Sequence, residues 1–462
     1  MGYAGTMDWE TASHEALVAR VQQQDALLTE LRATMAAQQA TIARLEQRIG
    51  ELERGSGSPS GMPGHKPGPA SPVVPRPRRK RPLNFARPRA TPTSQVRHAV
   101  AVCPDCGTTL AGGAVKRTRE VIEVVPTPVS ITEHVYLERC CPTCRTRHTP
   151  SVDLAGVVVG QSRLGVGLLS LIATLREEAR LPFAAIQRYL ASVHGLTLSV
   201  GALVGAVQQV ARAAQGALAE ISASVRGSSV VHADETGWRE GGSNGYIWTF
   251  STPDACFFTH GGRGKGMVDE GLSANAQGVL VSDFYAAYDH YPCLQQKCWA
   301  HLLRDVHDLR VRHPTDAELV TWATKVQALY ARALADAQAL AGTPAETPAR
   351  QRLRQTLMAE LLALCQPALA EETAAQAGLC RRIDKHLASL FVFVLDPAVP
   401  ATNNAAERSL RHLVIARKIS GGTRSKEGTA TKLALASLFT TWRLRGRDPY
   451  AACLALLASP QA

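Results

Sequence analysis

The sequence predicts a multidomain chain in which a coiled coil, a zinc ribbon and a helical region precede an α/β domain that is interrupted by an all-α insertion. Three observations support this fold class. Apolar residues recur every seven positions in residues 13–54, and two CPxC pairs bracket residues 101–150. Short apolar strands in residues 228–312 give way to an Ala- and Leu-rich helical block in residues 313–395. The length of 462 residues also exceeds that of one ordinary domain.

The N-terminal residues 13–54 carry a heptad repeat. Its a positions hold Val21, Leu28, Met35, Ile42 and Ile49. Its d positions hold Leu17, Leu31, Leu45 and Leu52, interrupted by Gln24 and Gln38. A repeat sustained over this many heptads predicts a coiled coil that joins copies of the chain. The alternative is one amphipathic helix that packs on its own protein.

Residues 55–100 are predicted to be a basic linker. Frequent Pro and Gly, with few large apolar residues, prevent this segment from forming a core. It contains nine Lys or Arg and no Asp or Glu, in a chain whose formal net charge is +12. This concentration indicates a polyanionic partner, most simply nucleic acid, although a solubilising tail is the alternative. The residues expected to follow DNA phosphates are Arg78, Arg79, Lys80 and Arg81.

The sequence also indicates a cytoplasmic protein. MGYAGTMDWE has no basic region followed by an apolar run, so no secretory signal is expected. The most apolar stretch, residues 164–175, is too short to span a bilayer, and we expect no membrane association. Eleven cysteines in such a protein indicate thiols or metal ligands rather than disulfides.

Residues 101–150 are predicted to form a zinc ribbon. The two CPxC pairs are Cys103 with Cys106 and Cys141 with Cys144. A CPxC turn lets two thiolates converge on one ion, and four thiolates form a closed tetrahedral site for one structural Zn²⁺. Residues 116–140 alternate apolar and polar side chains, which predicts strands. His148 or Cys140 could replace a ligand, and two unrelated redox CxxC pairs are the alternative.

Residues 160–225 are predicted to be helical. One helix should end at Gly195, and Ser199 is a candidate N-cap for the next. A helix, a short turn and a second helix are compatible with a helix-turn-helix DNA reader. Generic packing of helices explains the same pattern.

Two of the apolar strands that follow end in an aspartate. The strands are expected at residues 228–234, 245–250, 255–260 and 278–283, and the first and last end at Asp234 and Asp283. A strand end is a costly place for a carboxylate, because desolvation opposes its charge. Two such aspartates, with a later glutamate, favour convergence on divalent cations. Two Mg²⁺ ions can activate an attacking oxygen and stabilise a leaving oxygen in phosphodiester chemistry.

The later glutamate is Glu407, in the stretch TNNAAERSLR of residues 402–411. If Asn404 is the N-cap of a helix, Glu407 lies three residues later and the two form a capping box. In that case Glu407 has a structural role only. The same residue could instead be the third carboxylate of a metal site. Local sequence leaves both interpretations open.

Four motifs resemble those of the insertion sequence 66 family of bacterial transposases. They are HADETGWR (232–239), VSDFYAAYDHY (281–291), CWAHLLRDVHDL (298–309) and NNAAERSLRHLVIARK (403–418), followed by GGTRSKEG and GRDPY. The resemblance covers nearly the whole chain. It implies a ribonuclease H-like catalytic domain made of residues 228–312 and 396–462, with residues 313–395 as an insertion. It also implies a catalytic triad of Asp234, Asp283 and Glu407 that holds two Mg²⁺ or Mn²⁺ ions.

The resemblance assigns roles to further residues. Cys298 and His301 are similar to a Cys/Asp-x-x-His signature of related groups and are expected to support the triad. Phe284 departs from the pattern, because an alanine is expected beside Asp283. Glu235 is the alternative first acid. Contacts to DNA phosphates are expected from Arg408, Arg411, Arg417 and Lys418.

The implied function is that of a DNA transposase of a bacterial insertion sequence, active in the cytoplasm at the nucleoid. It would bind the terminal inverted repeats, hydrolyse the element ends and join the freed 3′-hydroxyl to target DNA. Its expected partners are DNA, further copies of the chain through the coiled coil, and small accessory proteins. The alternatives are a non-catalytic zinc-dependent DNA-binding regulator and a ribonuclease H-like nuclease without strand transfer.

Overall fold

The computed structural model describes residues 91–122, 129–272, 278–371 and 373–459, together with Val18 and Gln22. The chain divides into two compact units, Met1–Val121 and Ile122–Ala462. Apart from Val18 and Gln22, which are helical, the predicted coiled coil of residues 13–54 lies outside the described residues. So do most of the basic linker and its residues Arg78, Arg79, Lys80 and Arg81.

The strand prediction for residues 116–140 is largely wrong. In the described part of this segment only Arg139–Cys140 (β1) forms a strand, which pairs antiparallel with Arg147–His148 (β2). The apolar residues described in this segment are exposed, and Ile131 for example is 88% exposed. Alternation of this kind gives a strand only when a neighbouring strand and an apolar layer cover it, and the described residues provide neither here.

The larger unit contains a five-stranded sheet with the order β5-β4-β3-β6-β7. Its strands are β3 (Val230–Glu240), β4 (Ser243–Ser251), β5 (Cys256–Gly261), β6 (Val279–Ser282) and β7 (Leu294–Lys297). The strands β3, β4 and β5 form an antiparallel meander, while β6 and β7 run parallel to β3. The four predicted strands are confirmed. The short, polar β7 (LQQK) has no apolar pattern from which it could be predicted.

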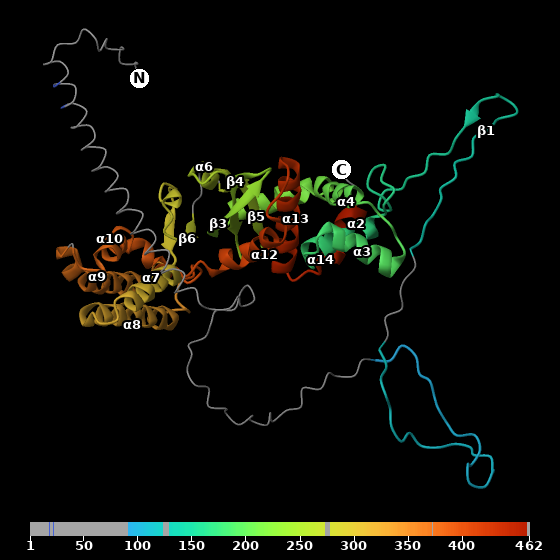
Figure 1. Cartoon of the computed structure of the whole chain (residues 1–462), viewed down its shortest axis with the longest axis horizontal. Coiled ribbons are helices and arrows are strands. Elements are labelled where there is room, and N and C mark those ends of the chain that lie inside the picture. The colour runs from blue at the N-terminus through green and yellow to red at the C-terminus, as the bar shows by residue number, and fades with distance from the viewer. Residues whose placement is uncertain are drawn as a thin grey trace. The chain divides into compact units, whose positions relative to one another are not determined.

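Helices cover the sheet on the side of its antiparallel strands (Figure 1). The helix α12 (Asn404–Ser420) packs on β3 and β4, and α13 (Lys426–Leu444) packs on β5. Their shared core contains Trp238, Ile247 and Phe258 from the sheet with Leu410 and Leu413 from α12. Through these apolar contacts, the helix that contains Glu407 packs against the strand that contains Asp234.

The helical region precedes the sheet in sequence. Its helices are α2 (Val166–Glu177), α3 (Phe183–His194), α4 (Val200–Ala213) and α5 (Gln215–Arg226), and α14 (Pro449–Ala458) packs against α2. Gly195 ends α3 with φ of 64°, and the Ser199 hydroxyl accepts the amide of Ala202, which confirms both predicted helix boundaries. The helix α4 exposes only its first two residues and Arg212. This burial favours packing over a role as a DNA-reading helix.

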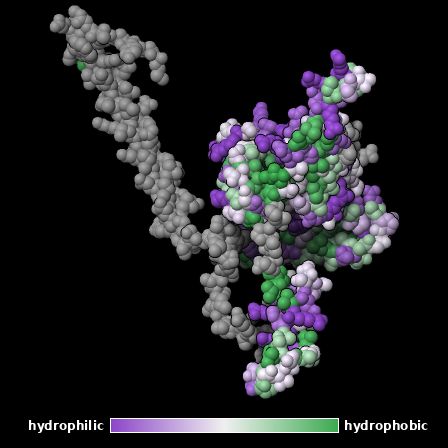
Figure 2. Space-filling view, turned by 90° about the vertical axis from the view of Figure 1, so that its right-hand side faces the viewer, coloured by the Kyte–Doolittle hydropathy of each residue, from purple (hydrophilic) through white to green (hydrophobic). Residues whose placement is uncertain are grey.

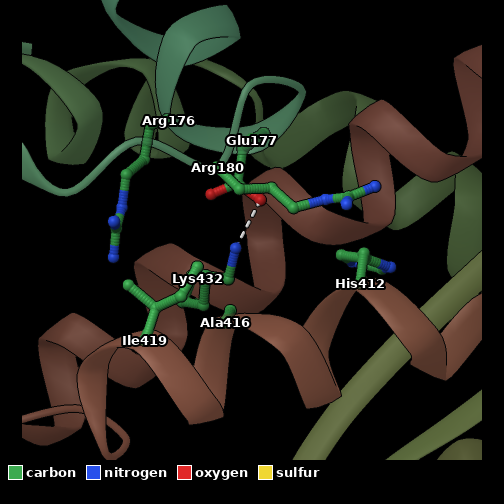
Figure 3. A pocket seen from close by; sticks show the side chains of 7 residues that line it. All are labelled: Arg176, Glu177, Arg180, His412, Ala416, Ile419 and Lys432. Carbon is green, nitrogen blue, oxygen red and sulfur yellow. Dashed lines mark hydrogen bonds and ion pairs between the residues drawn. The ribbon is translucent and has the colours of Figure 1, made fainter. Parts of the chain in front are cut away.

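A buried ion pair joins this helical region to α13. Lys432 of α13 donates to Glu177 of α2 at 2.6 Å, and their side chains are 9% and 1% exposed. Figure 3 shows the pair beside His412, which lies on α12. Burial, together with the charge of Lys432, lowers the pKa of His412 to about 3, so this imidazole is neutral at physiological pH.

A second helical block follows β7 and occupies the other end of this unit (Figure 1). It comprises α7 (Trp299–Arg312), α8 (Ala317–Ala339), α9 (Pro348–Ala370), α10 (Ala377–Lys385), η2 (Leu387–Leu390) and α11 (Val392–Leu395). Two short helices also lie near the sheet, α6 (Gly266–Gly271) and η1 (Ala286–Tyr288). The core of the block reaches the sheet through Val281 and Trp299. The prediction that residues 313–395 are largely helical is confirmed.

No helix in the described part of the chain combines the length and apolar character needed to cross a membrane. On the face shown in Figure 2, hydrophobic residues lie interspersed with hydrophilic ones. Scattered exposure of this kind is ordinary for globular proteins.

Candidate active site

The two aspartates of separate sequence motifs lie on neighbouring strands. Val230 pairs with Val279 and His232 with Val281 in the parallel ladder between β3 and β6. Two residues further along, the same register sets Asp234 level with Asp283. Adjacent strands are about 4.8 Å apart, so the carboxyl ends of these strands bring both acids to one edge. Asp234 was predicted at a strand end, but β3 continues to Glu240; the acid lies where pairing with β6 stops.

Asn403 fixes the start of α12 at this edge of the sheet. It is fully buried, and its amide nitrogen donates to the carbonyl of Ala233 at 2.7 Å. Its side-chain oxygen lies 3.0 Å from Nδ1 of His232, and its backbone N–H donates to Sγ of Cys298 at 3.1 Å. One residue therefore joins the helix to β3 and to Cys298, the residue that follows β7. Its role was not predicted, although both Asn403 and His232 lie in the quoted motifs.

Glu407 lies in the first turn of α12. The capping-box alternative is wrong, because the N-cap is Asn403 rather than Asn404 and its side chain makes no capping hydrogen bond. Oε1 of Glu407 is buried with no hydrogen-bond partner in the described chain, and it lies 3.6 Å from Nε2 of His301. A buried carboxylate oxygen without a donor is costly, so this position suits a bound cation.

The three acids act on one another electrostatically. Burial, together with the negative charges of Glu235, Asp283 and Glu407, raises the pKa of Asp234 to about 7. Asp234 accepts the amide of Glu235 at 2.9 Å, and Asp283 accepts the amide of Tyr285 at 2.8 Å. These single backbone bonds do not neutralise the charge. A divalent cation would.

Cys298 and His301 lie next to the acids. Ser282 pairs with Lys297 between β6 and β7, so Cys298 follows level with Asp283 on the third strand. A hydrogen bond to Cys298 raises the pKa of His301, and the charges of Glu407 and Asp283 act in the same direction. The predicted supporting residues thus connect the end of β7 to Glu407.

Glu235 occupies a different environment from its neighbour. Its Oε1 accepts Nε and Nη2 of Arg263 at 3.1 and 2.9 Å, and its Oε2 accepts the hydroxyl of Tyr288 at 2.7 Å. Its side chain is only 4% exposed. Both oxygens are therefore engaged, and Asp234 is the acid left without a cation.

The acids form no finished metal site. Among the residues that the structure describes, no three His, Cys, Asp or Glu side chains are grouped closely enough to hold an ion. The orphaned oxygen of Glu407 and the raised pKa of Asp234 nevertheless fit a hard cation between the carboxylates, and oxygen donors suit Mg²⁺. The residues present therefore fit the group that the sequence implied.

The two CPxC pairs form turns of the same kind. In each, the amide of the first cysteine donates to a threonine carbonyl five residues later, at 2.9 Å. The fifth residue of each turn has positive φ, 76° at Gly107 and 57° at Arg145. Hydrogen bonds from Thr146 lower the pKa of the Cys144 thiol to about 7. Such thiols ionise readily, as zinc ligands must.

The four-cysteine zinc site stays a prediction. Cys103 and Cys106 belong to the unit Met1–Val121, while Cys141 and Cys144 belong to the larger unit. The alternative ligands Cys140 and His148 lie in the strands β1 and β2.

Three of the four expected DNA contacts on α12 are exposed, namely Arg408, Arg411 and Lys418. Arg417 is half-buried, and its Nη1 donates to the Thr236 hydroxyl at 3.3 Å and to the Gly237 carbonyl. It thus ties α12 to β3.

Comparison with known proteins agrees with this geometry. A family model described as "Transposase IS66 family" matches residues 161–431, more than half of the 462 residues and all three acids. No curated protein matches the chain. A mixed sheet of this order with its acids gathered at one edge, inside a matched segment of this length, shows that the chain belongs to the IS66 family of transposases.

Proposed function

We propose that this protein is a DNA transposase that cleaves element ends and performs strand transfer with Asp234, Asp283 and Glu407. One observation carries the proposal: the ladder between β3 and β6 sets both aspartates level, and Asn403 fastens the helix of Glu407 to the same edge. Membership of the transposase family implies that DNA is the binding partner.

Each residue has a distinct task in this proposal. Asp234, Asp283 and Glu407 would hold two Mg²⁺ or Mn²⁺ ions, which when bound assist the attacking and leaving oxygens of phosphodiester chemistry. His301 lies 3.6 Å from Glu407 and orients its carboxylate. The exposed Arg408 and Arg411 follow on the same helix, where they can pair with DNA phosphates.

The remaining parts of the chain would bind DNA and other copies of the protein. We assign self-association to the heptads of residues 13–54 and phosphate contacts to the linker of residues 55–100. The two CPxC turns would be the zinc-binding parts of the chain, because their shared hydrogen bonding and the ready ionisation of Cys144 suit metal ligands.

The decisive experiment is strand transfer by Glu407→Gln in the full chain with Mg²⁺. We expect activity to fall about a thousandfold or more, because the carboxylates act as one unit. Glu427→Gln is the matched control, since Glu427 is also in the first turn of a helix but is exposed and pairs with Arg212 at 3.6 Å. Circular dichroism checks folding. Near-normal strand transfer by folded Glu407→Gln would refute the proposal.

The rival functions give different results in the same assays. A non-catalytic regulator would bind the terminal repeats and show no cleavage by the wild-type protein. A nuclease of the same fold would cleave the ends in a triad-dependent way, without joining them to target DNA.

A further inference from the structure

A cavity of about 350 Å³ lies between the edge strand β7 and the helical block. Its walls come from the segment that follows η1, from β7, and from α9, α10, η2 and α11. The described lining contains none of the three acids. This volume falls within the range of small-ligand sites.

The charged groups around the cavity are mostly cationic. Asp289 is the acidic residue of its lining, and Lys385 donates to Oδ2 of Asp289 at 2.8 Å. The fully buried Lys297 lies 3.0 Å from Oδ1 of the same carboxylate. Burial opposes ionisation of Asp289, but the hydrogen bonds from Lys385 and Lys297 prevail and lower its pKa. The carboxylate is already neutralised, so the charge of a further cation in the lining stays unbalanced.

That further cation is Arg354 of α9. Its Nη2 donates to the carbonyl of Ala388 at 2.8 Å, but its Nε is buried with no hydrogen-bond partner in the described chain. Burial alone lowers the pKa of this guanidinium. A buried N–H of a charged group without an acceptor is costly, and the planar fork of arginine matches phosphate oxygens.

We propose that this cavity is a binding site for a phosphate group, held chiefly by Arg354 and Lys385. Arg354 and Lys385 line the cavity together with one carboxylate, Asp289, which also pairs with the buried Lys297, so an anion balances the remaining positive charge and supplies the missing acceptor. His386 and Ser389 line the same cavity and add polar contacts. The phosphate could belong to a DNA backbone or to a free phosphate compound, which share this chemistry.

The cavity has a physical connection to Asp283. Lys297 reaches from Asp289 to the hydroxyl of Ser282 at 3.3 Å, and Ser282 precedes Asp283. On the other side of Asp283, the ring of Phe284 contacts His386 with centroids 5.6 Å apart. Phe284, which departs from the family pattern, thus packs against a wall of the cavity. A phosphate bound in the cavity would therefore restrict the motion of the residues on both sides of Asp283.

The first test uses inorganic phosphate as the probe and the melting temperature of the full chain as the readout. Phosphate should raise Tm of the wild-type protein more than sodium chloride of equal ionic strength does, because a ligand of the folded state stabilises it. Lys385→Gln should lose this excess. Arg352→Gln should keep it, since Arg352 is an exposed cation of the same helix as Arg354 and lies outside the lining. Lys385 is 64% exposed, so its replacement should not disturb folding. Arg354→Gln gives a second, more buried test.

The second test identifies the source of the phosphate. If DNA supplies it, Lys385→Gln should lower the slope of log affinity for duplex DNA against log salt by about 1, and Arg352→Gln should leave it unchanged. If the slope is unchanged while the excess Tm shift is lost, a free phosphate compound is the ligand. If the excess shift is absent from the wild-type protein, or equal in Lys385→Gln, and the slope is also unchanged, the proposal is overturned. Neither readout needs strand transfer, so these results are separate from the proposed function.

Discussion

Two adjacent carboxylates on β3 have opposite surroundings. Glu235 is enclosed by Arg263 and Tyr288, which satisfy both of its oxygens. Asp234 lies near two further acids, and among the described residues it accepts one hydrogen bond, from the backbone of Glu235. Burying charge without a partner is costly, and proteins retain such costs mainly where function requires them. The comparison teaches that the charge balance around a carboxylate, more than its presence in a motif, separates a structural acid from a candidate metal ligand.

The largest expected effect contrasts these two acids directly. Asp234→Asn should lower strand transfer about a thousandfold or more, because it removes a ligand of the shared site. Glu235→Gln should keep most of the activity, since Gln retains an oxygen for Arg263. Strand-transfer rates of both variants at saturating Mg²⁺ measure the contrast. Equal losses would show that both faces of β3 serve the chemistry.

The next effect concerns how the third acid is held. Asn403→Ala removes the hydrogen bonds of this side chain to Ala233 and His232, and should lower strand transfer about 10–100-fold, as expected when a residue that orients ligands is lost. The Mg²⁺ concentration for half-maximal activity should rise as well. Asn404→Ala is the control, because Asn404 is the exposed neighbour at the first position of α12. A loss of activity with an unchanged Mg²⁺ requirement would assign Asn403 to folding alone.

The smallest effect is on stability. The pKa of Asp234 is raised from 3.8 to about 7 in the folded protein. Between these values the folded state binds a proton that the unfolded state has lost, so unfolding becomes easier as pH rises. In EDTA, the Tm of Asp234→Asn should therefore rise relative to that of the wild-type protein as the pH increases from about 4 to about 7. Each kcal/mol of difference in the free energy of unfolding should shift Tm by roughly 2–4 °C. Added Mg²⁺ at pH 8 should raise Tm of the wild-type protein more than that of the variant. A gain independent of pH would refute the charge argument.

The sequence predicted those parts of this arrangement that depend on short patterns. Apolar runs of β-branched residues predicted β3 and β6 correctly, and the motifs around Asp234, Asp283 and Glu407 singled out acids whose catalytic role stays a prediction. The neutralisation of Glu235 could not be predicted, since Arg263 and Tyr288 come from two other segments of the chain. The role of Asn403 depends on partners about 170 residues away in sequence. In the described part of residues 116–140 the strand prediction was largely wrong, because alternation does not reveal whether a neighbouring strand exists.

The separation between Asn403 and its partners also bears on how the protein is made. A ribosome completes β3 and β6 long before it reaches α12, and the helical block of residues 299–395 must be synthesised in between. Closing so long a loop is a late and slow step of folding. We therefore expect a nascent or truncated chain that ends before α12 to lack its third acid. Under the proposed function, such a chain would bind DNA without cleaving it, so cleavage would depend on the synthesis of α12.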